Sequence, residues 1–219
     1  MRLTLYGYWR SSASWRVRIG LHLKGLDFAY APVHLVADGG QHRGEAHRAR
    51  NPMAQVPVLA VEEGGHVRYL SQSLAILGWL DDQLPSPRLW PVDPWQRATV
   101  TQLAEVVNAG IQPLQNLGVL RRVQELGGDR AGWARDVIGD GLDALEAMAA
   151  ATAGRFVVGD QVTAADLCLV PQLYNARRFG LDLAGFPTLT RVEAACAELP
   201  AFQAAHPDRQ PDAVPPESP

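Results

Sequence analysis

The prolines between residues 85 and 94 constrain the fold of this chain more than any other feature of its sequence. Four of these ten residues are proline. Proline has no backbone N–H and a fixed φ, so the stretch cannot lie inside a continuing helix and is typical of a linker. We therefore expect a first domain over residues 1–84, a linker over 85–94 and a second domain over 95–219. The 219 residues, 47% of them hydrophobic, are enough for two small cores.

The first domain mixes strand and helix patterns. A strand at Leu3–Tyr6 precedes a helix over Ser12–Lys24, and Gly25 stands where the residue ending a helix is expected. A second strand follows over Phe28–Leu35. A β–α–β unit of this length predicts two parallel strands joined by a helical crossover.

The rest of this domain is expected to contain a short helix, two strands and a final helix. A short helix is expected near residues 45–50, and strands at 56–61 and 66–70 flank a Glu-Glu-Gly-Gly turn that favours a hairpin. A final helix begins at Ser71 or Ser73. The order β-α-β-α-β-β-α is that of a thioredoxin-like α/β domain.

Beyond the linker, helical patterns dominate, so the second domain is expected to be all-α. Thr163 and Asp166 form a Thr-x-x-Asp capping box, which predicts the start of a buried helix. The last stretch, residues 200–219, is rich in Pro and Asp and is expected to be an extended, partly disordered tail. The expected helices cover residues 95–126 with a break at Pro113, 130–151, 164–177 and 187–198.

Composition argues against several kinds of partner. A net charge of −3, with scattered basic residues, provides no patch for a nucleic acid. Cys168 and Cys196 alone form neither a disulfide framework nor a redox pair. Without a secretory leader or an apolar run of about 18 residues, we expect a cytoplasmic protein that does not enter membranes. His42 and His47 lie on a polar stretch where no further metal ligands converge, so we expect no metal.

The segment between the first strand and the first helix is the most informative candidate site. Ser11, Ser12 and Ser14 stand at a helix N-terminus, where unpaired N–H groups and the helix dipole favour an anion. A serine hydroxyl there can hydrogen-bond a thiolate and lower the pKa of a bound thiol. The alternative is that these serines merely cap the helix.

Two further segments of the same domain suit a peptide ligand. Val56-Pro57 precedes a strand, where a thioredoxin-like domain places a cis proline and leaves the Val56 backbone groups open to a ligand. Gln72-Ser73 begins another helix, suited to a carboxylate or to ordinary capping. Glutathione has two carboxylates, a peptide backbone and a thiol, and the three segments together match these parts.

These segments lie in longer stretches that resemble the zeta class of the glutathione transferase family. The first stretch resembles the class signature Ser-Ser-Cys-x-Trp-Arg-Val-Arg, and the resemblance covers nearly the whole chain. The matching stretches are residues 11–18, 38–41, 51–57, 72–76, 109–116, 159–172 and 206–212.

The resemblance implies a glutathione transferase fold, usually a homodimer, with glutathione as cofactor. Ser11 would activate the glutathione thiol, with Ser12 assisting. The other implied contacts are Val56 beside cis Pro57 for the cysteinyl backbone, Gln72 and Ser73 for the γ-glutamyl end, His42 for the glycyl end, and Gln112, with Asn116 nearby, across a dimer interface.

The sequence departs from the class pattern at two places. Ala13 replaces the signature cysteine, which puts in doubt any transfer or redox activity that uses a protein thiol there. His42 stands where the class has a Gln, which retains a hydrogen-bonding group but alters its chemistry.

The activity implied by the resemblance is glutathione-dependent cis–trans isomerisation of maleylacetoacetate to fumarylacetoacetate, a step of tyrosine and phenylalanine catabolism. A thiolate adding to the alkene makes the double bond single, so that it can rotate before the thiolate leaves. The substrate carboxylates and the enolate favour arginine, whose planar fork binds oxyanions in a bidentate way. Arg10 beside the serines is one candidate and Arg178, by resemblance, is the other; an ordinary surface charge is the alternative for each.

Three other activities remain open. Maleylpyruvate isomerisation uses the same chemistry, but some such enzymes carry an extra arginine where this chain has Asn116–Val119. A transferase or dehalogenase acting on α-halo acids is a second alternative. A non-enzymatic thioredoxin-like binding protein is the third, and the intact Ser11, Val56-Pro57 and Gln72-Ser73 argue against it.

Overall fold

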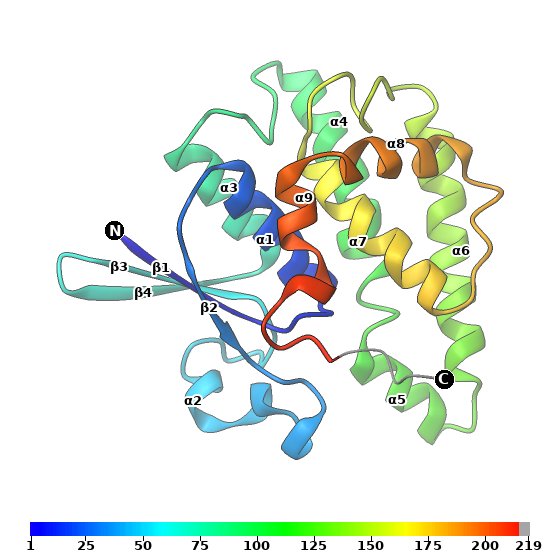
Figure 1. Ribbon diagram of the computed structural model, residues 1–219. Coiled ribbons are helices and arrows are strands. Elements are labelled where there is room, and N and C mark those ends of the chain that lie inside the picture. Colours follow the sequence, from blue (N-terminus) through cyan, green and yellow to red (C-terminus); the bar gives the residue numbers. More distant parts are fainter. Residues whose placement is uncertain (215–219) are drawn as a thin grey trace. The chain divides into compact units, whose positions relative to one another are not determined.

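The computed structural model describes residues 1–214 of the chain, which forms two compact units (Figure 1). The first unit comprises Met1–Arg88 together with Leu199–Pro219, and the second comprises Leu89–Glu198. This grouping differs from the expected helical domain over 95–219, because the end of the chain packs with the first unit. The sequence could not indicate that the C-terminal residues pack with the first unit, because this packing depends on contacts between residues far apart in the chain.

The C-terminal segment is more ordered than the expected extended tail. Helix α9 (Pro200–Ala205) packs against α1 (Ser12–Leu23), and a 3₁₀ turn η4 (Pro207–Arg209) follows. The expectation of an extended tail is therefore wrong for most of residues 200–214. The remaining five residues, 215–219, lie outside the described part of the chain.

The first unit is built on a four-stranded sheet with the order β2-β1-β3-β4. β1 runs parallel to β2 and antiparallel to β3, which forms a hairpin with β4. This mixed sheet confirms the predicted thioredoxin-like order. The elements of the unit, apart from those already given, are β1 (Arg2–Gly7), β2 (Ala29–Pro32), η1 (Ala37–Gly39), η2 (Gln41–Arg43), α2 (Glu45–Arg48), β3 (Val58–Glu63), β4 (His66–Ser71) and α3 (Ser73–Gln83).

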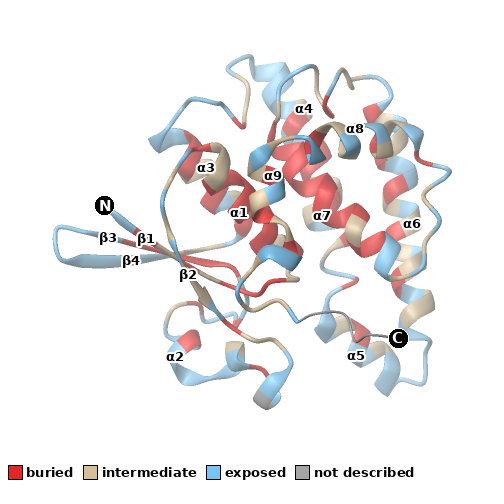
Figure 2. Ribbon diagram, viewed as in Figure 1, coloured by how far each residue is buried: buried red, intermediate tan, exposed pale blue. Residues whose placement is uncertain are grey.

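Helix α1 is the centre of this unit (Figure 2). It contacts both α3 and α9, and most of its residues are buried. It ends as predicted at Gly25, whose φ is +62°. The N–H groups of Gly25 and Leu26 donate to the carbonyls of His22 and Leu21, each at 3.1 Å, which satisfies the last carbonyls of the helix.

Lys24, the single lysine of the chain, ties the end of α1 to the segment after α3. Its buried ammonium donates to Asp81 Oδ1 at 2.7 Å and to the Leu84 and Pro87 carbonyls at 2.5 Å each. A compact ammonium has three donors on one atom, so it can serve three acceptors that converge on one point. Residues 84–87 are thereby held on the first unit.

The second unit consists of helices, and its centre is the buried helix α7 (Figure 2). The expected helix over 95–126 is divided by a π-helical turn, η3, and by the turn around Pro113. In the described part of the chain, no helix is both long enough and apolar enough to cross a membrane. The elements of this unit are α4 (Pro94–Glu105), η3 (Val106–Ile111), α5 (Leu117–Glu125), α6 (Arg130–Ala149), α7 (Ala164–Arg178) and α8 (Pro187–Ala197).

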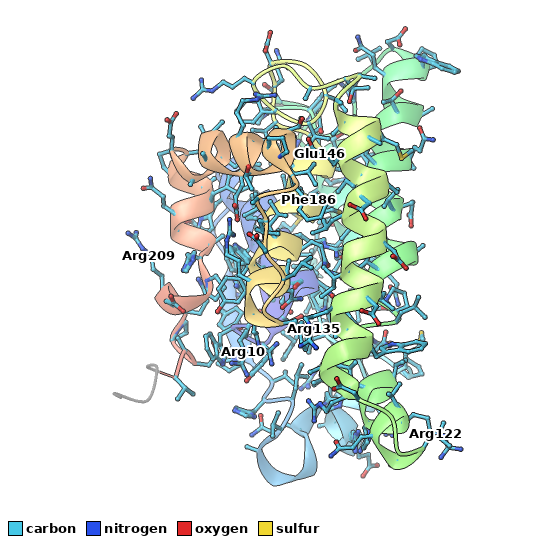
Figure 3. All side chains as sticks on the ribbon, turned by 90° about the vertical axis from the view of Figure 1, so that its right-hand side faces the viewer. Arg10, Arg122, Arg135, Glu146, Phe186 and Arg209 are labelled. Atoms are coloured by element: carbon cyan, nitrogen blue, oxygen red, sulfur yellow. The ribbon has the colours of Figure 1, made fainter. Side chains whose placement is uncertain are left out.

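Acidic side chains cap several helices of this unit, among them α7 and α8. The predicted box at the start of α7 is confirmed, with the Thr163 N–H donating to Asp166 Oδ2 at 2.8 Å. Asp166 Oδ1 also accepts from the Val157 N–H at 2.8 Å. Glu146 projects from α6 near Phe186 (Figure 3), and its two oxygens accept from the N–H groups of Thr188 and Leu189 at 2.9 and 3.0 Å.

Replacing Asp166 by Ala tests the capping box. The substitution leaves two buried N–H groups without an acceptor, and we expect a loss of about 3 kcal/mol in the free energy of unfolding. Burial raises the pKa of Asp166 from 3.8 to about 6, so the folded protein holds this proton more tightly than the unfolded chain does. The stabilisation by Asp166 therefore decreases as the pH rises from about 4 to about 6.

Urea denaturation at pH 4 and pH 7 measures this effect. The deficit of Asp166→Ala relative to the parent should be larger at pH 4. Asp143→Ala, at an exposed position of α6, is the control and should change stability by no more than about 0.5 kcal/mol. Equal losses for the two variants would contradict the buried cap.

Candidate functional site

The sheet register brings three loops to one edge of the first unit. Tyr6 of β1 pairs with Val58 of β3, and Val58 pairs with Ser71 of β4. The loop after β1, the loop before β3 and the loop after β4 therefore leave the sheet side by side. The segments singled out from the sequence, Ser11-Ser12, Val56-Pro57 and Gln72-Ser73, lie on these three loops.

Ser11 is the N-cap of α1, as the capping interpretation predicted. Its Oγ accepts from the Ser14 N–H at 3.2 Å, and its own N–H donates to the Tyr8 carbonyl at 3.0 Å. An Oγ that accepts a hydrogen bond still has its own proton to donate. The Ser11 hydroxyl can therefore cap the helix and donate to a ligand at the same time. The hydrogen bond from the Ser14 N–H orients the hydroxyl for this donation. Ser12, the first helical residue, is buried behind it.

The Val56–Pro57 peptide bond is cis, as the fold context predicted. Two buried side chains hold the loop in front of it, since the Asn51 amide and the His47 ring each bond the Gln55 carbonyl at 2.9 Å. Within residues 1–214, no hydrogen bond engages the Val56 N–H or C=O. The backbone of Val56 is thus available to pair with an extended peptide.

Gln72 has an unusual backbone conformation for a residue other than glycine, with a φ of +70°. It precedes α3, and no side chain caps that helix. Ordinary capping, the alternative interpretation of this segment, is therefore not what Gln72 does. A non-glycine residue at positive φ costs about 1–3 kcal/mol, and such strain is concentrated at ligand sites.

A buried positive charge lies behind this helix start. Arg16 of α1 is fully buried, and its Nη1 donates to the Oγ of the buried Ser73 at 3.1 Å. The guanidinium and the N-terminus of α3 both favour an anion near Ser73. This role of Arg16 was not predicted from the sequence, because only the fold brings the residue to Ser73.

His42 lies on η2, in the segment that follows β2. β2 also ends at this edge, since its Pro32 pairs with Gly7. Burial, followed by the nearby positive charge of Arg43, lowers the pKa of the half-buried His42 below 6.5, so the ring is neutral at pH 7. Gly40, at φ +95°, leaves room for the ring, because a Cβ there would lie 2.4 Å from His42 Cε1.

Arg10, labelled in Figure 3, directly precedes Ser11 in the chain and is half-buried. Its guanidinium carbon lies 5.0 Å from the centre of the Trp9 ring, a cation–π distance. The aromatic ring limits the orientations of this charge without neutralising it. The guanidinium therefore remains able to bind an oxyanion.

Three predicted site residues belong to the second unit. Gln112 follows η3 and donates its N–H to the Val107 carbonyl at 2.9 Å. Asn116 is the exposed N-cap of α5, and Arg178 is the exposed last residue of α7, 5.4 Å from the Phe179 ring. A site that includes residues of both units stays a prediction.

The second unit also contains a buried amide pair that was not predicted from the sequence. Gln115 and Gln172 exchange two hydrogen bonds of 2.9 and 3.1 Å, although both residues lie in stretches that carry the family resemblance. The pair holds the turn between Gln112 and Asn116 onto α7. Two glutamines 57 positions apart give no signal of pairing in a single sequence.

The protein thiols are unsuited to catalysis. Cys168 and Cys196 are buried and form no disulfide, and burial raises the pKa of the Cys196 thiol. Ala13 occupies the first turn of α1, so a thiol for this site has to come from a ligand. Among the residues that the structure describes, no group of three His, Cys, Asp or Glu side chains could hold a metal ion.

The chain matches known proteins over most of its length. Residues 10–83 match the model of the glutathione S-transferase N-terminal domain, and residues 138–200 match that of the C-terminal domain. Maleylacetoacetate isomerase of Rattus norvegicus is 47% identical over 208 residues, which are 95% of this chain and 94% of that protein.

Two solved structures are similar in sequence and in fold. Maleylacetoacetate isomerase of Anaeromyxobacter dehalogenans, with bound GSH in its active site, has a TM-score of 0.90 and 58% identity, covering 97% of this chain and 98% of that one. The holo structure of a maleyl pyruvate isomerase, a bacterial zeta-class glutathione S-transferase, has a TM-score of 0.90 and 41% identity, covering 96% and 100%.

Substitutions at Gln72 test the strain at the site. Glycine adopts a positive φ without a steric penalty and alanine does not, so Gln72→Gly should be more stable than Gln72→Ala by about 1 kcal/mol. Gln102, an exposed residue inside α4, is the matched control, because in the middle of a helix glycine is less stable than alanine by about 0.5–1 kcal/mol. Thermal and urea unfolding of the four variants should show opposite signs, and the same sign at both positions would exclude strain at Gln72.

Proposed function

Because the chain belongs to the zeta class of the glutathione S-transferase family, we propose that it is a glutathione-dependent maleylacetoacetate isomerase. One observation supports this most strongly: a serine N-cap, a cis-proline loop and an uncapped helix start share one edge of the sheet. The tripeptide has a matching group for each of them.

The residues of the first unit fit glutathione. Gln72, Ser73 and the N-terminus of α3 would hold the γ-glutamyl carboxylate, with the buried Arg16 adding positive charge. The free backbone of Val56, beside cis Pro57, would pair with the cysteinyl residue. The remaining contacts that we propose are Ser11 and Ser12 at the thiol, His42 as a neutral donor to the glycyl end, and Gln112 with Asn116 across a dimer interface.

Ser11 would lower the pKa of the bound thiol. Its oriented hydroxyl donates to the sulfur and stabilises the thiolate over the thiol. The positive end of the α1 dipole acts in the same direction. No protein thiol competes for this place, because Ala13 replaces the cysteine of the class signature.

Glutathione, when bound, supplies a thiolate that adds reversibly to the cis alkene, so that the bond becomes single, rotates and forms again as trans when the thiolate leaves. The chain's own residues hold the charges that this requires. Arg10, restrained by Trp9, and Arg178 would bind the substrate carboxylate and the enolate oxygen. Electrostatic stabilisation of this kind commonly contributes roughly 10²–10³ in rate.

Maleylpyruvate isomerisation is the second candidate, because a maleyl pyruvate isomerase is 41% identical over 96% of this chain. The stretch Asn116–Val119 has no arginine, which favours maleylacetoacetate. Activity toward α-halo acids would use the same bound thiol as a side reaction.

We also propose that the protein is a cytoplasmic homodimer that acts in tyrosine and phenylalanine catabolism. Similarity to the rat isomerase over 95% of this chain supports the pathway. Exposed apolar side chains such as Met53, Val67 and Tyr69 support an interface on the first unit. Light scattering coupled to gel filtration would measure the mass of the assembly.

The first experiment follows the absorbance of maleylacetone, an analogue of maleylacetoacetate, with purified protein and glutathione. We expect rapid isomerisation that requires glutathione and does not consume it, because the thiol is regenerated in each cycle. Maleylpyruvate is the comparison substrate. Folded protein that binds glutathione and isomerises neither compound would refute the proposal.

Replacing Ser11 by Ala should raise the pKa of the bound glutathione thiol and lower kcat by roughly 10²-fold, because a donor to the thiolate is lost. It should also cost about 1 kcal/mol of stability as a lost N-cap. Asp93→Ala is the matched control, since Asp93 caps α4 through the Gln96 N–H at 2.8 Å and has no part in the site. An equal fall in kcat for both variants would count against a role for the Ser11 hydroxyl.

A further inference from the structure

The end of the chain holds the backbone of the loop that leads to Ser11. The Trp9 N–H donates to Asp212 Oδ2 at 3.0 Å, across 203 positions of sequence. The Trp9 carbonyl accepts from Arg18 Nη2 at 2.8 Å. Both polar backbone groups of Trp9, two residues before Ser11, are thus held by side chains outside the loop.

Arg18 links this loop to helix α9. Its guanidinium is fully buried, and Nε donates to the carbonyl of Ala205, the last residue of α9, at 3.0 Å. Burial lowers the Arg18 pKa to about 10, so the group still carries its charge at neutral pH. One buried cation therefore connects the Trp9 carbonyl to the end of α9.

Asp212 is itself anchored. The Tyr30 hydroxyl donates to Asp212 Oδ2 at 3.4 Å, and burial raises the pKa of Tyr30, which keeps it a donor. The Gln210 side-chain amide donates to the Ala204 and His206 carbonyls at 3.1 and 2.9 Å, and the backbone carbonyl of Gln210 accepts from the Ala213 N–H at 3.0 Å. We call residues 205–213 the C-terminal strap.

We propose that Asp212 and Arg18 are positioning residues, through which the C-terminal strap orients the Trp9–Ser11 loop and with it the Ser11 hydroxyl. This proposal rests on the proposed function. The groups assigned to the tripeptide backbone and γ-glutamyl end lie on other loops, at Val56 and Gln72-Ser73. Loosening the Trp9 peptide should therefore disturb the thiol more than the affinity for glutathione. A displacement of about 1 Å can cost roughly 10²-fold in rate.

Asp212→Ala tests the proposal. We expect kcat for maleylacetone to fall roughly 10–100-fold per folded molecule while KM for glutathione changes little. Ultraviolet titration of the bound thiolate should give a higher thiol pKa than in the parent. Asp212→Asn, which retains an oxygen to accept from the Trp9 N–H, should restore most of both values.

Arg209→Gln is the matched control on the same strap, because the exposed Arg209 projects outward (Figure 3). It should leave kcat and the thiol pKa unchanged. If Asp212→Ala does not fold, Tyr30→Phe removes the hydroxyl that bonds both Asp212 and Arg18, and it should shift both quantities in the same direction by a smaller amount.

The outcomes separate this proposal from the proposed function. If Asp212→Ala lowers only the melting temperature, with kcat and the thiol pKa equal to the parent values, the strap is merely structural and the inference is wrong. If the parent does not isomerise maleylacetone, the proposed function fails. In that case the ultraviolet titration still tests the positioning role of the C-terminal strap. An unchanged thiol pKa in Asp212→Ala would overturn this role whether or not the protein turns over a substrate.

Discussion

Two arginines buried in helix α1 organise the first unit. Buried guanidinium groups are costly unless acceptors surround them, so each restricts the positions of the segments that it bonds. Arg16 bonds Ser73 at the start of α3, while Arg18 bonds Trp9 and the last carbonyl of α9. They are two positions apart and so point to different sides of the helix. The candidate site depends on both, because each determines one of its loops.

The chemistry of the site follows from backbone groups that the fold leaves unsatisfied. The start of α3 has no side-chain cap, and no hydrogen bond within residues 1–214 engages the Val56 backbone. Such groups gain hydrogen-bond partners when a peptide with carboxylates binds. The positive φ of Gln72 differs in kind, since it is local backbone strain that lowers stability at the candidate site.

Family membership and local geometry carry different parts of the functional argument. Similarity at 58% identity to a maleylacetoacetate isomerase that holds GSH indicates the cofactor and the reaction class. The local geometry supports the proposal that Ser11 activates the thiol without a cysteine at residue 13. Because Ser11 both caps α1 and retains a proton to donate, activation of the thiol does not require a protein thiol.

The sequence by itself determined the features that depend on neighbours a few residues apart. Gly25 at the end of α1, the Thr163–Asp166 box and the Ser11 cap were all predicted, because a single turn of backbone specifies them. Cis Pro57 was predicted only through the fold context. The tertiary structure alone decided the Arg16–Ser73 bond, the Gln115–Gln172 pair and the docking of Asp212 on Trp9. These contacts join residues 57 to 203 positions apart, and no local pattern encodes which distant partner a buried polar group will meet.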